Sequence, residues 1–289
     1  MLFLCFFSSL VQGQIVLQDS VMNGNNFEKA AFRLWIGKQT QQVKGIIVLV
    51  PGSNGDGRNM IESQSWQALA NKNGMALLGC NFRDKRSLNM AIEQYADVKN
   101  GSGQAMLDVI NRMASASGHP ELGNAPMAFW GMSAGGEFNY EFAVWKPERV
   151  ITFVVNKGGV YYTALAPEAT RAIPAVFLTG EIDNPYRNNI VKGIFSINRR
   201  FGAKWMFAEE LGIGHQFSDS EGFVQEFFSQ IIPLRLGGNG KLNQMNQLGY
   251  IGENETKEIH KVVKGQRFKG ITSWFANQEM AANWLKFIQ

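Results

Sequence analysis

The sequence has little cysteine and no long apolar run, and both absences narrow the kind of protein that it encodes. Only two cysteines occur among its 289 residues. Cys5 lies in an N-terminal apolar run, so if that run is removed the remaining chain can form no internal disulfide. Cys80 ends the apolar segment 75–80, and we expect it to be a buried core residue rather than a nucleophile. A membrane-spanning helix needs roughly 20 consecutive apolar residues, and no segment offers them.

Concentrated charge of one sign is also missing. The chain has 28 Lys and Arg against 24 Asp and Glu, for a formal net charge of +4. Much of the excess lies beyond position 240, where basic and acidic residues are interleaved, as in Lys257-Glu258. A nucleic-acid site requires a concentrated basic stripe with aromatic residues for base stacking. We therefore expect no nucleic-acid partner and an ordinary solvated surface.

Residues 1–13 form a short apolar run that ends in small and polar residues. The run is too short to span a bilayer and is typical of the apolar core of a secretory signal, although basic residues do not precede it. We therefore expect a signal peptide over 1–13, which predicts a secreted or periplasmic protein. The alternative interpretation is a buried first strand.

Beyond this run the chain alternates predicted strands and helices as far as position 232. Strands are expected over 27–36, 43–50, 75–80, 126–130, 150–155, 175–179 and 204–209, and helices over 59–73, 103–117, 134–145, 187–201 and 221–232. Such alternation predicts an α/β fold with a mostly parallel sheet and helices on both faces. In an open sheet of this kind, ligands bind beyond the C-terminal ends of the strands.

A change of composition divides the chain near position 237. Residues 237–247 are rich in Gly, Asn and Gln, which is typical of a linker or surface loop. We therefore predict a catalytic domain over 14–236 and a C-terminal extension over 237–289 that packs on it. Within the extension, 281–288 has the pattern of an amphipathic helix that docks on the main domain.

The strongest local motif is Gly131-Met132-Ser133-Ala134-Gly135, which fits G-x-S-x-G. An apolar predicted strand precedes it and a helix-forming run follows, as a nucleophile on a sharp strand-to-helix turn requires. The N-terminus of that helix would favour developing negative charge beside the hydroxyl. We predict that Ser133 is a nucleophile; the alternative is a purely structural strand-to-helix turn.

A serine hydroxyl needs an adjacent base to take its proton, and the chain offers three histidines. His119 precedes Ser133 in a Gly-His-Pro turn, and His260 lies in a charged stretch that is typical of a solvated helix face. His215 lies in the glycine-containing loop 212–216 after a predicted strand, which is the placement that a base needs. We predict His215 as the base; otherwise it would be a loop histidine with a structural hydrogen bond.

The base in turn needs a carboxylate that fixes its tautomer and stabilises the imidazolium. Asp183 follows the predicted strand 175–179 and gives the chain order Ser133, Asp183, His215. Glu181, two residues earlier in the chain, is the other candidate for this carboxylate. We favour Asp183 because the loop has to leave the sheet edge before its side chain can reach the histidine.

An oxyanion intermediate needs two preorganised hydrogen-bond donors. We predict the backbone N–H of Ala134, which follows the nucleophile, and that of Ser53 in the glycine-rich loop after the strand 43–50. The loop 52–57 lacks the Gly-Lys-Ser/Thr ending of a P-loop, which argues against a phosphate site.

Four motifs together resemble the α/β-hydrolase superfamily, namely Pro51-Gly-Ser, Gly131-Met-Ser-Ala-Gly-Gly, Gly-Glu-Ile-Asp183 and Gly-Ile-Gly-His215. Within it, the chain is similar to secreted esterases of the polyhydroxybutyrate-depolymerase and feruloyl-esterase group. The resemblance covers about 43–232, and Pro51 stands where many members have His. It implies an α/β-hydrolase fold and transfer of an acyl group to water through an acyl-serine, with no metal and no organic cofactor.

The sequence therefore predicts a secreted carboxylic ester hydrolase that acts on a small-molecule or polymeric ester. Candidate substrate contacts are Asn54 and Met132 beside the predicted donors, and Lys157 and Tyr161 after the strand 150–155. Tyr161 could equally pack in the core or at the rim. Two alternatives stay open: a serine peptidase of the same fold, and a binding protein that keeps the fold without catalysis. The large extra domain that such peptidases often carry is not visible, and a binding protein has no need of all three predicted catalytic side chains.

Overall fold

The computed structural model describes residues 13–86, 93–237, 241–245, 248–263 and 271–289. Apart from Gly13, the predicted signal peptide lies outside the described residues, and so does Cys5. Cys80 is buried and has a free thiol. Among the helices of the described part, none is both long and apolar enough to cross a membrane.

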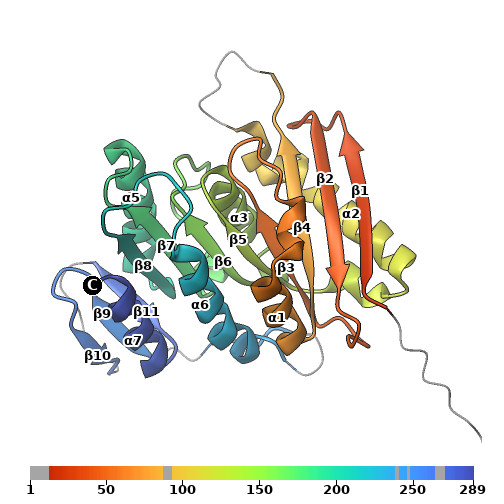
Figure 1. Cartoon of the computed structure of the whole chain (residues 1–289). Helices are drawn as coiled ribbons and strands as arrows, with labels where there is room; N and C mark the ends of the chain where they lie inside the picture. Colours follow the sequence, from red (N-terminus) through yellow and green to blue (C-terminus); the bar gives the residue numbers. More distant parts are fainter. Residues whose placement is uncertain (1–12, 87–92, 238–240, 246–247, 264–270) are drawn as a thin grey trace, which may run out of the picture.

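An eight-stranded sheet forms the centre of the molecule, in the order β1-β2-β4-β3-β5-β6-β7-β8 (Figure 1). Its strands are β1 (Ile15–Met22), β2 (Lys29–Ile36), β3 (Gly45–Val50), β4 (Met75–Arg83), β5 (Met127–Gly131), β6 (Val150–Asn156), β7 (Ala175–Gly180) and β8 (Trp205–Glu210). β2 pairs antiparallel with β1 and with β4, and every other neighbouring pair is parallel. The mostly parallel α/β sheet expected from the sequence is confirmed.

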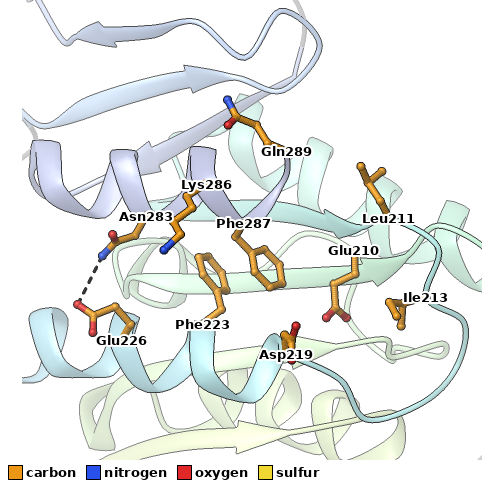
Figure 2. A pocket seen from close by; sticks show the side chains of 10 residues that line it. All are labelled: Glu210, Leu211, Ile213, Asp219, Phe223, Glu226, Asn283, Lys286, Phe287 and Gln289. Atoms are coloured by element: carbon orange, nitrogen blue, oxygen red, sulfur yellow. Dashed lines mark hydrogen bonds between the residues drawn. The ribbon is translucent and has the colours of Figure 1, made fainter.

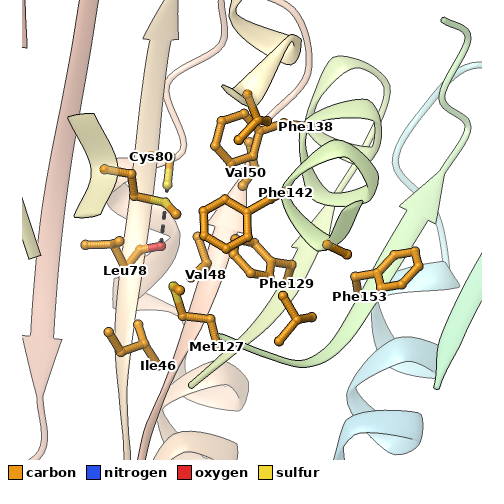
Figure 3. Close-up of a cluster of buried hydrophobic side chains, with 14 of the residues drawn as sticks. Ile46, Val48, Val50, Leu78, Cys80, Met127, Phe129, Phe138, Phe142 and Phe153 are labelled. Atoms are coloured by element: carbon orange, nitrogen blue, oxygen red, sulfur yellow. Dashed lines mark hydrogen bonds between the residues drawn. The ribbon is translucent and has the colours of Figure 1, made fainter. Parts of the chain in front are cut away.

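Helices cover both faces of this sheet, as Figure 1 shows. One face carries α2 (Ser102–Ser117), α3 (Ala134–Trp145) and α5 (Pro185–Arg200), and the other carries α1 (Gln64–Asn73) and α6 (Ser220–Arg235). The central strands are buried on both faces, so they consist of continuous apolar residues, as in β3, GIIVLV. In Figure 3, Val48 and Phe129 of the sheet meet Phe138 and Phe142 of α3.

Three local predictions differ from the structure. The edge strand β1 was not expected; its side chains alternate between half-buried and exposed, so it lacks the continuous apolar run of the central strands. The helix predicted over 59–73 is split into a 3-10 turn, Arg58–Glu62, and α1, because Ser63 between them is extended. His260, expected on a solvated helix face, lies in a strand instead.

That strand, β10 (Ile259–Lys261), belongs to a small antiparallel sheet formed after position 237. The sheet has the order β10-β9-β11, with β9 (Tyr250–Glu253) and β11 (Thr272–Phe275), and α7 (Gln278–Phe287) follows it. The helix predicted over 281–288 is α7, which begins three residues earlier and ends one residue earlier, but the three strands were not predicted, because each is only three or four residues long.

The extension packs on β8 of the main sheet. Trp284 of α7 is fully buried, and its indole N–H donates to the carbonyl of Phe207 at 2.6 Å. Ser273 of β11 accepts a hydrogen bond from the N–H of Phe207 at 2.8 Å. Figure 2 shows the contact with α6, where Phe223 stacks on Phe287 with ring centroids 4.1 Å apart. Main sheet and extension thus share one apolar cluster.

Candidate active site

Ser133 lies on the sharp turn between β5 and α3. Its backbone angles, φ 54° and ψ −127°, are unfavourable for a residue with a side chain. The two flanking glycines make the turn possible. A Cβ on Gly135 would lie 2.3 Å from the carbonyl oxygen of Val50, and one on Gly131 would lie 2.7 Å from the backbone of Gly135. Only glycine fits at either position, which explains the G-x-S-x-G pattern.

The structure brings Ser133, His215 and Asp183 into one hydrogen-bonded chain. Nε2 of His215 lies 3.0 Å from Oγ of Ser133, and Nδ1 lies 2.8 Å from Oδ2 of Asp183. Asp183 follows β7 and His215 follows β8, so adjacent parallel strands deliver both loops to one sheet edge. A carboxylate that accepts from Nδ1–H leaves Nε2 unprotonated, ready to accept the serine proton.

The other candidates for acid and base do not reach Ser133. Glu181 points elsewhere, because its Oε2 accepts the N–H of Gly212 at 2.8 Å. His119 is buried, with Nδ1 2.9 Å from Oε1 of Glu121. His260 lies in the extension, near Glu253 and Glu258.

Asp183 is itself held on two sides. Only 6% of its surface is exposed, and the N–H of Asn184 donates to its Oδ1 at 2.6 Å. The guanidinium of Arg187, one turn into α5, places Nε 3.9 Å from the same oxygen. A cation and a donor beside one carboxylate oxygen leave the other oxygen for His215.

The two backbone N–H groups predicted as oxyanion donors lie on either side of the nucleophile. Ala134 is the first residue of α3, so its N–H has no partner within the helix. Ser53 lines the same cavity as Ser133, and a Cβ on its neighbour Gly52 would lie 3.5 Å from Cβ of Ser133. In the described part of the chain, neither N–H has an acceptor.

Comparisons with known proteins agree with this architecture. A scan of protein-family models finds no match, and neither does a search of curated protein sequences. Solved structures do match the fold of this chain, and the three described next each have a match probability of 1.00. A ferulic acid esterase has a TM-score of 0.56 at 12% identity, over 78% of this chain and 100% of its own. The S-formylglutathione hydrolase FrmB from Staphylococcus aureus has a TM-score of 0.53 at 12% sequence identity, and the match covers 76% of this chain and 99% of that protein. Poly(aspartic acid) hydrolase-1 from Sphingomonas sp. KT-1 has a TM-score of 0.53 at 16% sequence identity, and the match covers 76% of this chain and 99% of that protein.

This chain has the α/β-hydrolase fold. At such low identity the likeness shows the fold alone, so the chemistry of this protein rests on its own residues.

Two cavities of the protein meet at Ser133. The larger, about 700 Å³, contains the predicted oxyanion loop and the catalytic candidates Ser133 and His215. Apolar side chains form much of its wall, namely Pro51, Met60, Met132 and Phe217. Phe217 is 57% exposed and stacks on Trp130 at 5.8 Å, so it forms an apolar rim.

The smaller pocket, about 210 Å³, shares only Ser133 with the larger cavity. Its remaining wall consists of Glu93, Glu137, Gly159, Val160, Tyr186 and Arg187. Glu137 is 3% exposed, and burial raises the pKa of its carboxyl group to about 7. Sequence reasoning missed this pocket, because its walls come from four segments far apart along the chain.

Of the four predicted substrate contacts, all of which the structure describes, Met132 alone belongs to the wall of either cavity at Ser133. The side-chain oxygen of Asn54 accepts the N–H of Asp84 at 2.9 Å, which holds in place the loop that also carries Ser53. Lys157 is fully buried, and its ammonium pairs with Glu210. Tyr161 packs edge-on against Tyr140 at 5.2 Å. These three side chains lie outside the walls of both cavities.

One group of described residues has the geometry of metal ligands. Glu253, Glu258 and His260 place three possible ligand atoms within 4.8 Å of one another. They belong to the small sheet of the extension and share no residue with either cavity at Ser133.

Proposed function

We propose that this protein is a carboxylic ester hydrolase that works through an acyl-serine intermediate. The observation that carries the proposal is the chain of hydrogen bonds from Ser133 through His215 to Asp183, at 3.0 and 2.8 Å. His215 takes the proton of the hydroxyl, and Oγ attacks the carbonyl carbon of the ester. Asp183 holds the imidazole in the required tautomer and stabilises the imidazolium that forms.

The oxyanion of the tetrahedral intermediate is stabilised by the N–H groups of Ser53 and Ala134. Both are backbone donors, held by the loop after β3 and by the start of α3, so they need no reorganisation during the reaction. His215 then gives its proton to the leaving alcohol. Water attacks the acyl-serine by the same route in reverse, and the acid is released.

The larger cavity has room for the apolar alcohol of an ester substrate. Its wall is largely apolar and it ends directly at Ser133 and His215, which suits a neutral group attached to the scissile bond. Among the structures with the same fold is a ferulic acid esterase, whose described activity is of this type.

The proposal is tested with short p-nitrophenyl esters and a fluorophosphonate probe. We expect turnover by the wild-type protein and covalent labelling of Ser133, located by peptide mass spectrometry. Ser133→Ala should abolish both while the circular dichroism spectrum stays unchanged. Labelling of another serine, or turnover retained in Ser133→Ala, would refute the assignment. Peptide substrates are assayed in parallel, and their cleavage in preference to the esters would show that the protein is a peptidase.

Export of the protein is part of the same proposal and rests on the apolar run within 1–13. Sequencing the N-terminus of protein recovered outside the expressing cells tests it. A mature chain that begins after Gly13 is expected. Protein that remains inside the cells with Met1 intact would contradict export.

A further inference from the structure

The smaller pocket at Ser133 has no role in the mechanism above, although it opens on the reacting hydroxyl. Its volume of about 210 Å³ corresponds to roughly seven water molecules, which is room for a short chain and not for a polymer segment. Two carboxyl groups and one guanidinium belong to its wall, those of Glu93, Glu137 and Arg187. It is therefore small, polar and charged, in contrast to the larger apolar cavity.

The mechanism decides which half of the ester enters this pocket. His215 must protonate the leaving oxygen, and His215 lines the larger cavity but not the smaller pocket. The alcohol half therefore occupies the larger cavity. The acyl half is the remaining substituent on the carbonyl carbon, and the smaller pocket on the other side of Ser133 is open to it.

Charge in the pocket favours a cation. The guanidinium of Arg187 is shared between two carboxyl groups: its Nε lies 3.9 Å from Oδ1 of Asp183, and its charge lowers the pKa of Glu137 against the larger, opposite effect of burial. The carboxylates of Glu93 and Glu137 have no such cation of their own, since none is within ion-pair distance of either in the described part of the chain. Three carboxyl groups, those of Asp183, Glu93 and Glu137, are thus opposed by one guanidinium, and the pocket keeps an excess of negative charge.

Glu137 supplies the second, independent observation. Its side chain is almost fully buried, and only Oε1 is used: it accepts the N–H groups of Gly159 at 2.7 Å and Val160 at 3.0 Å. Within the described residues Oε2 has no hydrogen-bond donor, although Glu137 forms part of the pocket wall. Oε2 is not among the fully buried side-chain atoms that lack a partner, so it is accessible to a donor that a ligand in the pocket supplies.

Building on the proposed esterase function, we propose that the substrates are esters whose short acyl group carries an ammonium. The ammonium binds between Glu93 and Glu137, donates to Oε2 of Glu137, and lies two or three bonds beyond the carbonyl carbon. Apolar alcohols fill the larger cavity. Glu93 and Glu137 thereby determine acyl specificity without taking part in the bond-breaking steps.

The test compares two esters of the same shape, β-alanine benzyl ester and benzyl butanoate, which differ by an ammonium in place of a methyl group. Charge-assisted hydrogen bonds predict a kcat/KM ratio of about 10 to 100 in favour of the β-alanyl ester. Glu137→Gln and Glu93→Gln should each bring the ratio towards one while benzyl butanoate is still hydrolysed.

Glu141→Gln is the matched control. Glu141 lies one turn further along α3, is also buried, and accepts the N–H groups of Tyr162 and Thr163 at 2.8 and 2.9 Å. It does not line the pocket, so its substitution should leave the ratio unchanged. A ratio that falls equally in Glu141→Gln would mean that the packing of α3, not the pocket, sets the preference, and would overturn the proposal.

The pH dependence of the ratio isolates Glu137 from His215, because His215 acts on both esters alike. Since the pKa of Glu137 is raised to about 7 by burial, its carboxylate forms as the pH rises through that value. The ratio should therefore increase between pH 6 and 8 in the wild-type protein and stay level in Glu137→Gln. A level profile in both would contradict the proposal.

Two further substrates decide between competing outcomes. Monobenzyl succinate carries a carboxylate in place of the ammonium; if it is preferred over benzyl butanoate, Arg187 makes the pocket an anion site and the proposal is wrong. Choline butanoate and 3,3-dimethylbutyl butanoate place the charge on the alcohol. If Glu137→Gln alters this pair instead, the acyl assignment is wrong.

Failure of this inference differs from failure of the proposed function. Equal turnover of the β-alanyl and butanoyl esters would overturn only the inference, because the protein would still be an esterase. No turnover of any ester, together with no fluorophosphonate labelling of Ser133, would overturn both.

Discussion

Ser133 has a backbone conformation that costs on the order of 1–3 kcal/mol for a residue with a side chain. Hydrogen bonds on both sides keep it there. Its N–H donates to the carbonyl of Asn156 at 2.7 Å, and its carbonyl accepts the N–H of Gly136 at 2.8 Å. The strain lifts the hydroxyl off the sheet edge towards His215, so stability is given up locally where the proposed reaction takes place.

Asp183→Asn tests the assignment of the acid. An amide donates to Nδ1 of His215 and so favours the wrong tautomer, which lowers kcat about ten-thousand-fold in a comparable triad. We expect a loss of that order for hydrolysis of a p-nitrophenyl ester at pH 7. Glu181→Gln is the control, because this carboxylate accepts only the N–H of Gly212. A larger loss in Glu181→Gln than in Asp183→Asn would contradict the assignment.

Ser133 and its flanking glycines could be predicted because their constraint is local, whereas Asp183 and His215 were predicted from their positions after two strands of the expected parallel sheet. The steric requirements of one turn explain Gly131, Ser133 and Gly135. All the residues concerned lie within five consecutive positions, so the motif can be recognised in the sequence. Lys157 was misjudged because its partner Glu210 is 53 residues away. The pocket residues Glu93 and Arg187 carried no pattern at all, since only the folded chain brings them to Ser133.

Glu137 should also make stability depend on pH. Its folded-state pKa is raised from 4.5 to about 7, so the folded protein holds this proton more tightly than the unfolded chain does. The resulting stabilisation is complete below about pH 4.5 and is lost as the pH rises through 7; a shift of this size corresponds to roughly 3 kcal/mol.

Urea denaturation of wild-type and Glu137→Gln protein from pH 4.5 to 8 measures this effect. The wild-type free energy of unfolding should fall relative to that of the variant across the range. Glu255→Gln removes an exposed carboxylate and should follow the wild-type curve. Parallel curves for wild type and Glu137→Gln would contradict the prediction.

At the scale of elements, a buried ion pair joins the ends of β6 and β8 beneath the active site. The ammonium of Lys157 pairs with Oε2 of Glu210, and both side chains are almost fully buried. Oε1 of Glu210 accepts the hydroxyl of Ser218 at 2.5 Å and the N–H of Ser220 at 3.1 Å. Glu210 thus holds both ends of the loop that carries His215.

Glu210→Gln should therefore affect stability and turnover together. Leaving the ammonium of Lys157 buried without its partner costs about 3–5 kcal/mol, which urea denaturation measures. A loosened loop misplaces His215, so kcat should also fall. The adjacent Glu209→Gln is the control, because Glu209 pairs with Lys192 at a half-exposed site, where loss costs about 0–1 kcal/mol. Equal effects of the two substitutions would contradict a positioning role for Glu210.

The strands that the sequence predicted well are those buried on both faces, because their apolar runs leave no other interpretation. β3 and β6 are of this kind. The edge strand β1 and the short strands β9 and β10 have mixed exposure, so their residues resemble loop residues. Burial had to extend over a run of apolar residues to make a strand visible: β11 is buried throughout, but its four residues, TSWF, include two polar ones, and it was missed.

At the scale of the whole molecule, the extension closes the open edge of the main sheet. The hydroxyl oxygen of Ser273 accepts a hydrogen bond from the N–H of Phe207, and the indole of Trp284 donates one to the carbonyl of the same residue. These side chains satisfy backbone groups on the outer edge of β8 that no further strand pairs with in the described part of the chain. An edge so covered is not open to pairing with another chain.

Trp284→Ala tests whether the extension and the main sheet unfold as one unit. Removing this buried indole should cost about 3–5 kcal/mol, through lost packing against Phe275 and the loss of one hydrogen bond to the carbonyl of Phe207. If the two parts are one cooperative unit, urea denaturation followed by circular dichroism should show a single transition at a lower midpoint. Lys286→Ala, exposed on the same helix, should change the midpoint little. Two separate transitions, with the second unmoved, would show instead that the extension is an independent domain whose loss the active site survives.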